Sequence, residues 1–229
     1  MRPAPVAAVA VRAVGEPGKL GEAPATSAGD ARHYAALDLG TNNCRLLIAA
    51  PREHGFAVVD AFSRIVRLGE GITHSGRLGE NAMHRAIEAL RICSQKLADR
   101  QVARARLIAT EACRSADNGA EFIERARTET GLALEIVSRE TEARLAVAGC
   151  ASLIDPEASG VILFDIGGGS SELVWIDLAR DGNGRRRRMS DRIRRWMSLP
   201  VGVVTISERH GGRHVTREGF EAMVAEVAA

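Results

Sequence analysis

The chain contains 229 residues, of which 45% are hydrophobic and 26% are charged, a balance typical of a globular protein with one large or two modest domains. A net charge of +2 and an aromatic content of 3% disfavour a nucleic-acid partner, and no apolar run approaches the length of a membrane span. The four cysteines lie far apart without a C-x-x-C pair, which excludes a disulfide framework or a zinc site of the usual spacing and favours a cytoplasmic protein.

The first 154 residues are expected to hold a tail and one folded lobe. Residues 1–31 are rich in Ala, Pro and Gly and lack periodicity, which predicts a disordered tail. Alternating and helical patterns over 32–154 then predict a first lobe of the order β-β-β-α-β-α-β-α. These elements are expected at 34–39, 45–50, 56–68, 80–99, 106–109, 118–130, 132–137 and 138–152.

A second lobe is expected over 155–229. The run Asp155-Pro156-Glu157 interrupts the periodicity and marks the predicted boundary between the lobes. The elements predicted for this α/β lobe correspond only to the opening elements of the first lobe. The second lobe is therefore expected to be incomplete, either because the chain is a fragment or because this lobe is short. Its strands are predicted at 160–166, 171–178 and 194–199, and its helices at 201–209 and 216–228.

The strongest motif begins with the first predicted strand of the second lobe. The run GVILFDIGGGSSEL at 160–173 is an apolar strand that ends at Asp165 and continues into a glycine-rich turn. Successive glycines let the backbone turn tightly and bring several N–H groups close to one anion, and serine hydroxyls add donors. Asp165 and Glu172 offer hard oxygen ligands for a divalent cation. The motif predicts a phosphate-binding turn made by Gly167, Gly168, Gly169, Ser170 and Ser171.

A weaker version of this motif lies near the start of the first lobe. The run YAALDLGTNNCRLLI at 34–48 places Asp38 at the end of an apolar strand, and a glycine and three small polar residues follow. Two such turns in separate lobes predict a shared phosphate-binding cleft, to which Thr41, Asn42 and Asn43 would contribute. The alternative is two ordinary hairpins whose aspartates accept hydrogen bonds from turn amides.

Four segments together resemble the exopolyphosphatase / guanosine pentaphosphate phosphohydrolase family. They are ALDLGTNNCRLLIA at 36–49, ATEACRSADNGAEFI at 109–123, IVSRETEARLA at 136–146 and VILFDIGGGSSELV at 161–174, and SLPVGVV at 198–204 also fits. The resemblance covers about residues 34 to 226. It implies the two-lobed, ribonuclease H-like α/β superfold shared by actin, acetate and sugar kinases and heat-shock chaperone ATPases, with a phosphate-binding cleft between the lobes.

The resemblance also assigns roles. It aligns Glu142 with the family's catalytic glutamate, which activates the attacking water, and it favours Arg114 as a phosphate-binding side chain. Hydrolysis of a phosphoanhydride also needs a metal ion on the leaving side, which predicts Mg²⁺ as cofactor, with Asp38, Asp165 and Glu172 as candidate ligands.

The residues alone leave alternatives to these roles. Arg114 is expected in the loop after strand 106–109, where it could be a surface arginine paired with Asp117. Glu142 falls in the first turn of a helix capped by Ser138, where the helix dipole favours its ionised form, and it could be a simple helix-start carboxylate. Glu140 is its local competitor, on another side of the helix.

The implied activity is removal of the terminal phosphate from inorganic polyphosphate, guanosine pentaphosphate or both. One departure is that residues 41–43 read Thr-Asn-Asn where the family often has Ser-Asn-Ser, which is expected to tune the phosphate contacts. Another is that the family's further glycine-rich segment of the second lobe is not found. The alternatives are an ATP-dependent phosphotransferase of the same superfold, a non-catalytic sensor of guanosine polyphosphates, and an inactive fragment. A homodimer is compatible with the sequence.

An arginine-rich run lies in the second lobe after the loop Asp181-Gly182-Asn183-Gly184. Its structural interpretation is a solvated hairpin extension, and its functional interpretation is a basic patch that attracts polyphosphate. The run consists of Arg185, Arg186, Arg187, Arg188, Arg192, Arg194 and Arg195.

Overall fold

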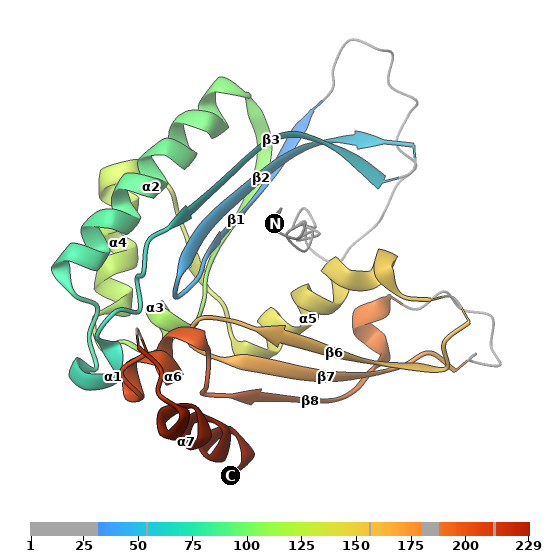
Figure 1. Cartoon of the computed structure of the whole chain (residues 1–229). Coiled ribbons are helices and arrows are strands. Elements are labelled where there is room, and N and C mark those ends of the chain that lie inside the picture. Colours follow the sequence, from blue (N-terminus) through green and yellow to red (C-terminus); the bar gives the residue numbers. More distant parts are fainter. Residues whose placement is uncertain (1–31, 54, 156, 180–187, 213) are drawn as a thin grey trace.

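The computed structural model describes residues 32–53, 55–155, 157–179, 188–212 and 214–229, which form two β-sheets with helices around them (Figure 1). The tail predicted at 1–31 and residues 185–187 of the arginine run lie outside the described residues. Over the described ranges, the order of strands and helices confirms the predicted α/β class. None of the helices in these ranges has the length and apolar character that crossing a membrane requires.

The first sheet has the strand order β3-β2-β1-β4-β5. Its first three strands form an antiparallel meander, and β4 runs parallel to both β1 and β5. Because β1 and β4 are parallel neighbours, the turn after β1 lies beside the segment after β4, and the N–H of Thr110 donates to the carbonyl of Leu39 (3.1 Å). The strands are β1 His33–Leu39, β2 Asn43–Arg52, β3 Gly55–Ile65, β4 Val102–Ala109 and β5 Glu135–Ile136.

Two helices, α2 (Glu80–Asp99) and α4 (Gly119–Thr130), cover one face of this sheet (Figure 1). Alternation along β1 turns Leu37 and Leu39 into the core that these helices share with the sheet. The same alternation turns Asp38 to the opposite face, where its charge interacts with that of Asp165 in the second sheet. The first sheet therefore turns its buried apolar face to the helices, and its other face carries the charged pair of neighbours Asp38 and Arg45 together with Ala36 and Leu47.

The second sheet has the order β6-β7-β8 and is antiparallel throughout. Helix α5 packs on one face, where Ala143 and Val147 bury against Leu163, Val174 and Ile176. The elements of this part are α5 Arg139–Cys150, η1 Ala151–Leu153, β6 Gly160–Ile166, β7 Ser171–Asp177, η2 Met189–Arg192, β8 Ile193–Leu199, α6 Val203–Arg209 and α7 Arg217–Ala228. Because α5 packs in the second hydrophobic core, the chain passes from the first core to the second before α5 and not at the composition break at 155–157. The division into domains stays a prediction.

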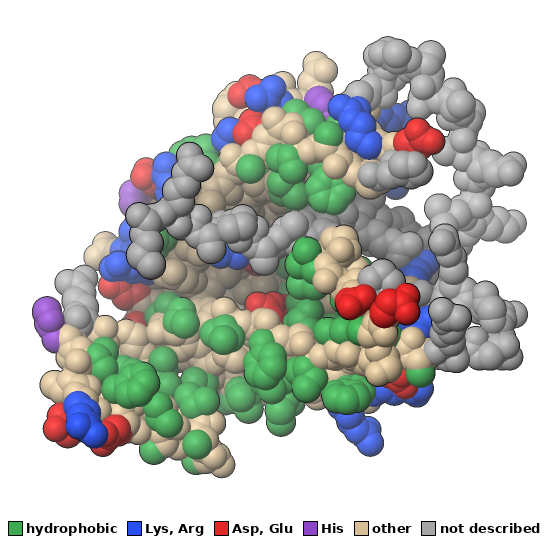
Figure 2. Space-filling view, turned by 45° about the vertical axis from the view of Figure 1, so that its right-hand side comes forward, with side chains coloured by type: hydrophobic (Ala, Val, Ile, Leu, Met, Phe, Trp, Pro, Cys, Tyr) green, Lys and Arg blue, Asp and Glu red, His purple; other side chains and the backbone are tan. Residues whose placement is uncertain are grey.

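The outer face of the second sheet carries large exposed apolar side chains. Figure 2 shows them as a broad apolar surface over the lower part of the molecule, continuing onto α7. They include Ile162, Phe164, Ile166, Trp175, Met197, Phe220, Val224 and Val227. The two faces of this sheet therefore differ: the outer face is apolar, and the inner one carries Asp165 and Glu172 beside α5.

Several predicted boundaries are wrong. The strand expected at 132–137 is reduced to Glu135–Ile136, because Leu132 and Leu134 are buried in the core without joining the β-ladder. The strand expected at 56–68 ends at Ile65, because the N–H groups of residues 66 and 67 donate to the carbonyl of Asn42 (2.8 and 3.0 Å). Two short helices, α1 Ile72–Ser75 and α3 Glu111–Ser115, were not predicted, because one turn is too short to show helical periodicity.

Candidate functional site

Two turns, one from each sheet, touch each other. The first turn (residues 40–43) follows β1, and the glycine turn (residues 167–170) follows β6. A Cβ atom on Gly168 would lie 3.0 Å from the Cβ of Thr41 and 3.2 Å from the backbone nitrogen of Asn42. A Cβ atom on Gly169 would lie 2.8 Å from the Oγ1 of Thr41. Glycines are needed here because any side chain would push the two turns apart. The contact brings together the two motifs that the sequence analysis singled out.

Helix α6 holds the carbonyl groups of the glycine turn. The N–H of Val203 donates to the carbonyl of Gly167 (3.0 Å), and the N–H of Val204 donates to that of Gly168 (2.8 Å). Over the described ranges, no acceptor pairs with the N–H groups of Gly168 and Gly169. Unpaired backbone N–H groups in a tight turn are suited to bind an anion. The turn therefore offers the donors that the predicted phosphate site needs, and its binding of phosphate stays a prediction.

Gly202, at the start of α6, contacts the glycine turn so closely that a methyl group does not fit. A Cβ atom there would lie 2.5 Å from the backbone carbon and oxygen of Gly168. These are main-chain atoms, so they cannot move away by a change of side-chain rotamer. We expect Gly202→Ala to cost about 1–3 kcal/mol of stability, which lowers the midpoint of thermal unfolding by roughly 2–10 °C. Gly79→Ala is the matched control, because nothing lies within 4 Å of the Cβ position at this N-cap of α2. Equal melting of both variants would contradict the close packing.

Acidic side chains gather beside the two turns. Asp165 and Glu172 are directly opposite each other on β6 and β7, and the Oε1 of the buried Glu172 accepts a hydrogen bond from Ser198 (2.7 Å). Burial raises the pKa of Asp38 to about 6, against the lowering effect of Arg45 and with a further rise from Asp165. Burial also raises the pKa of Asp165, and Arg45 again lowers it. The carboxyl groups at the ends of β1 and β6 therefore interact electrostatically across the two sheets.

Of the three residues predicted to bind magnesium, Asp38 and Asp165 fit the ion better as a pair than all three do together with Glu172. The Oδ1 of Asp38 is buried without a hydrogen-bond partner, and a cation beside Asp38 and Asp165 would coordinate this oxygen instead. In the part of the chain that the structure describes, no three His, Cys, Asp or Glu side chains lie close enough together to hold a metal ion. Magnesium commonly takes one or two carboxylates and completes its shell with water and phosphate. The assignment of Mg²⁺ ligands stays a prediction.

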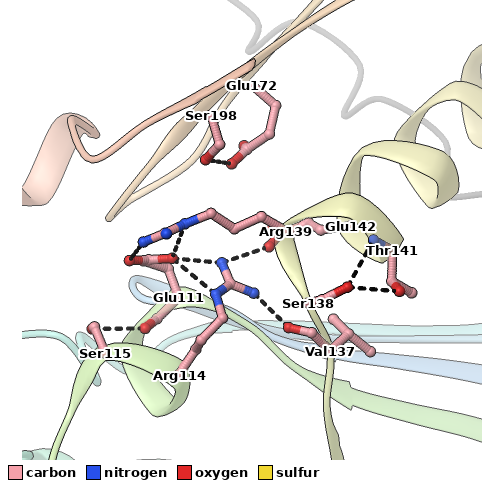
Figure 3. Close-up of polar contacts among 10 residues, drawn as sticks. All are labelled: Glu111, Arg114, Ser115, Val137, Ser138, Arg139, Thr141, Glu142, Glu172 and Ser198. Atoms are coloured by element: carbon pink, nitrogen blue, oxygen red, sulfur yellow. Dashed lines mark hydrogen bonds and ion pairs between the residues drawn. The ribbon is translucent and has the colours of Figure 1, made fainter. Parts of the chain in front are cut away.

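Glu142 and Arg114 form an ion pair (Figure 3). Glu111, the other ion-pair partner of Arg114, contacts the glycine turn at Gly169. The Nη2 of Arg114 donates to the Oε2 of Glu142 (3.0 Å), and its Nη1 donates to the carbonyl of Val137 (2.6 Å). Arg114 belongs to α3, not to a loop, because Thr110 begins a short helix directly after β4. The N-terminal turn of α5 presents Glu142, and the Oγ of Ser138 caps that helix by accepting the N–H of Thr141 (3.2 Å).

Burial determines the proton affinity of Glu142. It raises the pKa of this carboxyl to about 7, and it outweighs the nearby Arg114, which lowers the pKa, while the charges of Glu172 and Asp38 raise it further. The helix dipole was expected to favour the ionised form of Glu142, and burial shifts the pKa in the opposite direction. A carboxyl that titrates near neutral pH is well suited to accept a proton from water.

The structure settles two alternatives raised by the sequence. Glu140 pairs with Arg144 on the exposed side of α5, so it does not compete with Glu142. Arg114 pairs with Glu111 and Glu142 and not with Asp117, which removes its interpretation as a surface arginine paired with that aspartate.

The predicted phosphate ligands differ in how well they are placed. Thr41 and Ser170 are buried at the contact between the turns, and the Oδ1 of Asn43 is buried without a partner. Ser171 is the exception, because it lies on the other face of β7 from Glu172 and its hydroxyl donates to the carbonyl of Val201 (2.6 Å). Its hydroxyl is therefore used to hold the segment before α6.

Two charged residues of the site were not predicted, Glu111 and Arg139. The buried Glu111 accepts hydrogen bonds from both Arg114 and Arg139 (Figure 3). Both lie in the segments that carry the family resemblance, where Glu111 precedes Arg114 by three residues and Arg139 precedes Glu142 by three. On the helix predicted from Ser138 this spacing places Arg139 and Glu142 on one face, which was the available signal for Arg139. Glu111 had no such signal, because α3 was not predicted as a helix.

The comparisons with known proteins agree with this geometry. A family model described as the Ppx/GppA phosphatase family matches residues 47–228. A solved exopolyphosphatase-like protein is 29% identical with a TM-score of 0.73, over 86% of this chain and 59% of that one. The Aquifex aeolicus Ppx/GppA family member is 30% identical with a TM-score of 0.63, over 83% and 58%.

More distant structures share the same architecture. An exopolyphosphatase from Cytophaga hutchinsonii is 25% identical with a TM-score of 0.72, over 84% of this chain and 58% of that one. A chain of the PilM–PilN type IV pilus biogenesis complex is 11% identical with a TM-score of 0.52 and shows the fold alone. These likenesses confirm the predicted actin-like ATPase fold. The chain spans about three fifths of the length of the phosphatase relatives named here.

Proposed function

Because this chain belongs to the Ppx/GppA phosphatase family, we propose that its site hydrolyses the terminal phosphoanhydride bond of inorganic polyphosphate or guanosine pentaphosphate. The observation that carries the proposal is the ion pair between Glu142 and Arg114 beside the two touching turns. A base and a cation at this position are what phosphoryl transfer to water requires.

Each part of the site has a task in this reaction. The free N–H groups of Gly168 and Gly169, with the hydroxyl of Thr41, bind oxygens of the terminal phosphoryl group. The guanidinium of Arg114 neutralises the charge on these oxygens as the bond to the leaving phosphate breaks. Glu142 accepts the proton of the attacking water, and its raised pKa suits that transfer at neutral pH. Magnesium bound by Asp38 and Asp165 would supply charge neutralisation on the leaving phosphate.

The reaction is expected to slow as the pH falls below about 7, because a protonated Glu142 cannot accept a proton from water. The measurement is the pH profile of kcat/KM, whose acid limb should lie near the pKa of Glu142. An acid limb near pH 4–5, the range of ordinary carboxyl groups, would contradict the role of burial.

Stability should respond to the same carboxyl in the opposite sense. The pKa of Glu142 is about 7 in the folded chain and has an ordinary value of 4.5, so the folded chain binds more protons between these values. The contribution of Glu142 to the free energy of unfolding therefore falls as the pH rises through this window. Denaturant unfolding at several pH values should show this slope in the wild type and a smaller slope in Glu142→Gln.

Phosphate release with Mg²⁺ from each substrate tests the proposed function and separates it from its rivals. Release from long-chain polyphosphate, guanosine pentaphosphate or both is expected, and the ratio of the two kcat/KM values gives the preference. Binding of guanosine pentaphosphate without release would favour a sensor. Consumption of ATP only when an acceptor is added would favour a phosphotransferase.

A further inference from the structure

We propose that the carboxylate of Glu111 takes the place of a substrate phosphoryl group between Arg114 and Arg139, and that Arg139 is a second phosphate-binding arginine. The inference deepens the proposed function and rests on it. It concerns two residues that neither the sequence motifs nor the comparisons assign to phosphate binding.

The Glu111 carboxylate binds both guanidinium groups, Arg114 through one oxygen and Arg139 through both (Figure 3). Its Oε2 accepts from the Nε and Nη2 of Arg114 (3.1 and 2.5 Å) and from the Nε of Arg139 (3.2 Å). Its Oε1 accepts from the Nη2 of Arg139 (2.8 Å). Arginine forks bind two oxygens of a phosphate with the same donor pattern that they use for a carboxylate. Chemically, the two arginines already surround one bound anion, and that anion is part of the chain.

This internal anion lies at the proposed phosphate site. A Cβ atom on Gly169 would lie 2.9 Å from the Cγ of Glu111 and 2.8 Å from the Oγ1 of Thr41, so all three residues meet at one point. Arg114 joins Glu111 to Glu142, the proposed base. Arg139 and Glu142 share the first turns of α5. A phosphate bound by the two turns therefore competes with Glu111 for the same arginines.

The ion pairs of Glu111 with Arg114 and Arg139 stabilise the empty site and weaken its binding of a single phosphate. The side chains of Arg114 and Glu111 are only 17% and 10% exposed, and a buried cation without a partner is costly, so Glu111 stabilises the site before ligand binds. A ligand must then replace this carboxylate at both arginines, which lowers the apparent affinity for any single phosphate. Substrates with several linked phosphates gain further contacts that free phosphate lacks. Glu111 therefore selects against the product, inorganic phosphate, and assists its release.

The test is calorimetric titration of inorganic phosphate into the whole chain, with no turnover required. We expect Glu111→Gln to bind phosphate about tenfold or more tightly than the wild type, because the neutral amide competes weakly for two guanidinium groups. Glu111→Asp should also bind phosphate more tightly, because its shorter carboxylate reaches the arginines less well. It keeps the negative charge and serves if Glu111→Gln does not fold. Glu124→Gln removes an exposed ion pair with Arg127 at the same i,i+3 spacing, away from the site, and should leave the affinity unchanged.

Arg139 completes the test through a double-mutant cycle. Arg139→Gln should weaken phosphate binding, and the gain from Glu111→Gln should shrink when Arg139 is also replaced, because the two residues share the ligand. Unchanged or weaker phosphate binding by folded Glu111→Gln and Glu111→Asp would overturn the inference and leave Glu111 as a support for the arginines. The absence of phosphate binding from the wild type and both variants would overturn it as well. Hydrolysis that is lost in Glu142→Gln tests the proposed function separately.

Discussion

Replacing Glu142 by glutamine is expected to reduce kcat by about 10²–10⁴-fold while KM changes little, because only the proton acceptor is lost. The amide keeps the size of the side chain and an oxygen that can still accept the hydrogen bond from Arg114, which is 3.0 Å away in the wild type. Steady-state phosphate release gives both constants.

Glu140→Gln is the matched control for this substitution. It lies in the same turn of α5 but pairs with Arg144 on the exposed side, so its kcat should stay within a few-fold of the wild type. Equal losses in the two variants would point to a general effect on the helix. Full activity of Glu142→Gln would exclude this residue as the base.

Replacing Arg114 by lysine is expected to reduce kcat/KM by roughly 10²–10³-fold, the usual effect of removing one donor that stabilises a developing negative charge. Lysine keeps the charge but cannot contact Glu111, Glu142 and the carbonyl of Val137 at once, as the guanidinium does. The loss should appear in both kcat and KM, because Arg114 is proposed to bind the ground state and the transition state. Steady-state phosphate release measures both.

Arg127→Lys provides the comparison for Arg114→Lys. Arg127 forms an i,i+3 ion pair with Glu124 on the exposed surface of α4, so its replacement should leave kcat/KM unchanged. A folded Arg114→Lys variant with kcat/KM within a few-fold of the wild type would mean that phosphate is bound without this arginine.

Sequence reasoning predicted the parts of the site that depend on local backbone chemistry. The successive glycines at 167–169 and the Asp-Leu-Gly turn at 38–40 are specified by short-range rules, and the structure places these turns in contact. The long, strongly periodic helix α2 was predicted at its observed ends, because twenty residues give a clear apolar stripe.

The features that sequence reasoning missed depend on contacts between segments that are distant in the sequence. The strand around residue 135 was overextended, because apolar residues buried without a β-ladder look like a strand in the sequence. The raised pKa of Glu142 comes from burial and from the charges of Glu172 and Asp38, which are distant in the sequence, so a helix-dipole argument cannot include it. The ion pairs of Glu111 with Arg139 join residues 28 positions apart, so their partnership is a product of the fold.

Phosphate release in ¹⁸O-labelled water tests the central claim most directly. With polyphosphate or guanosine pentaphosphate and Mg²⁺, the wild type is predicted to release phosphate in which one oxygen comes from water, and Glu142→Gln is predicted to slow that incorporation with the same loss as kcat. Such a result places water activation at Glu142. Release of phosphate without the label, or equal incorporation rates in wild type and Glu142→Gln, would contradict hydrolysis by a water that this glutamate activates.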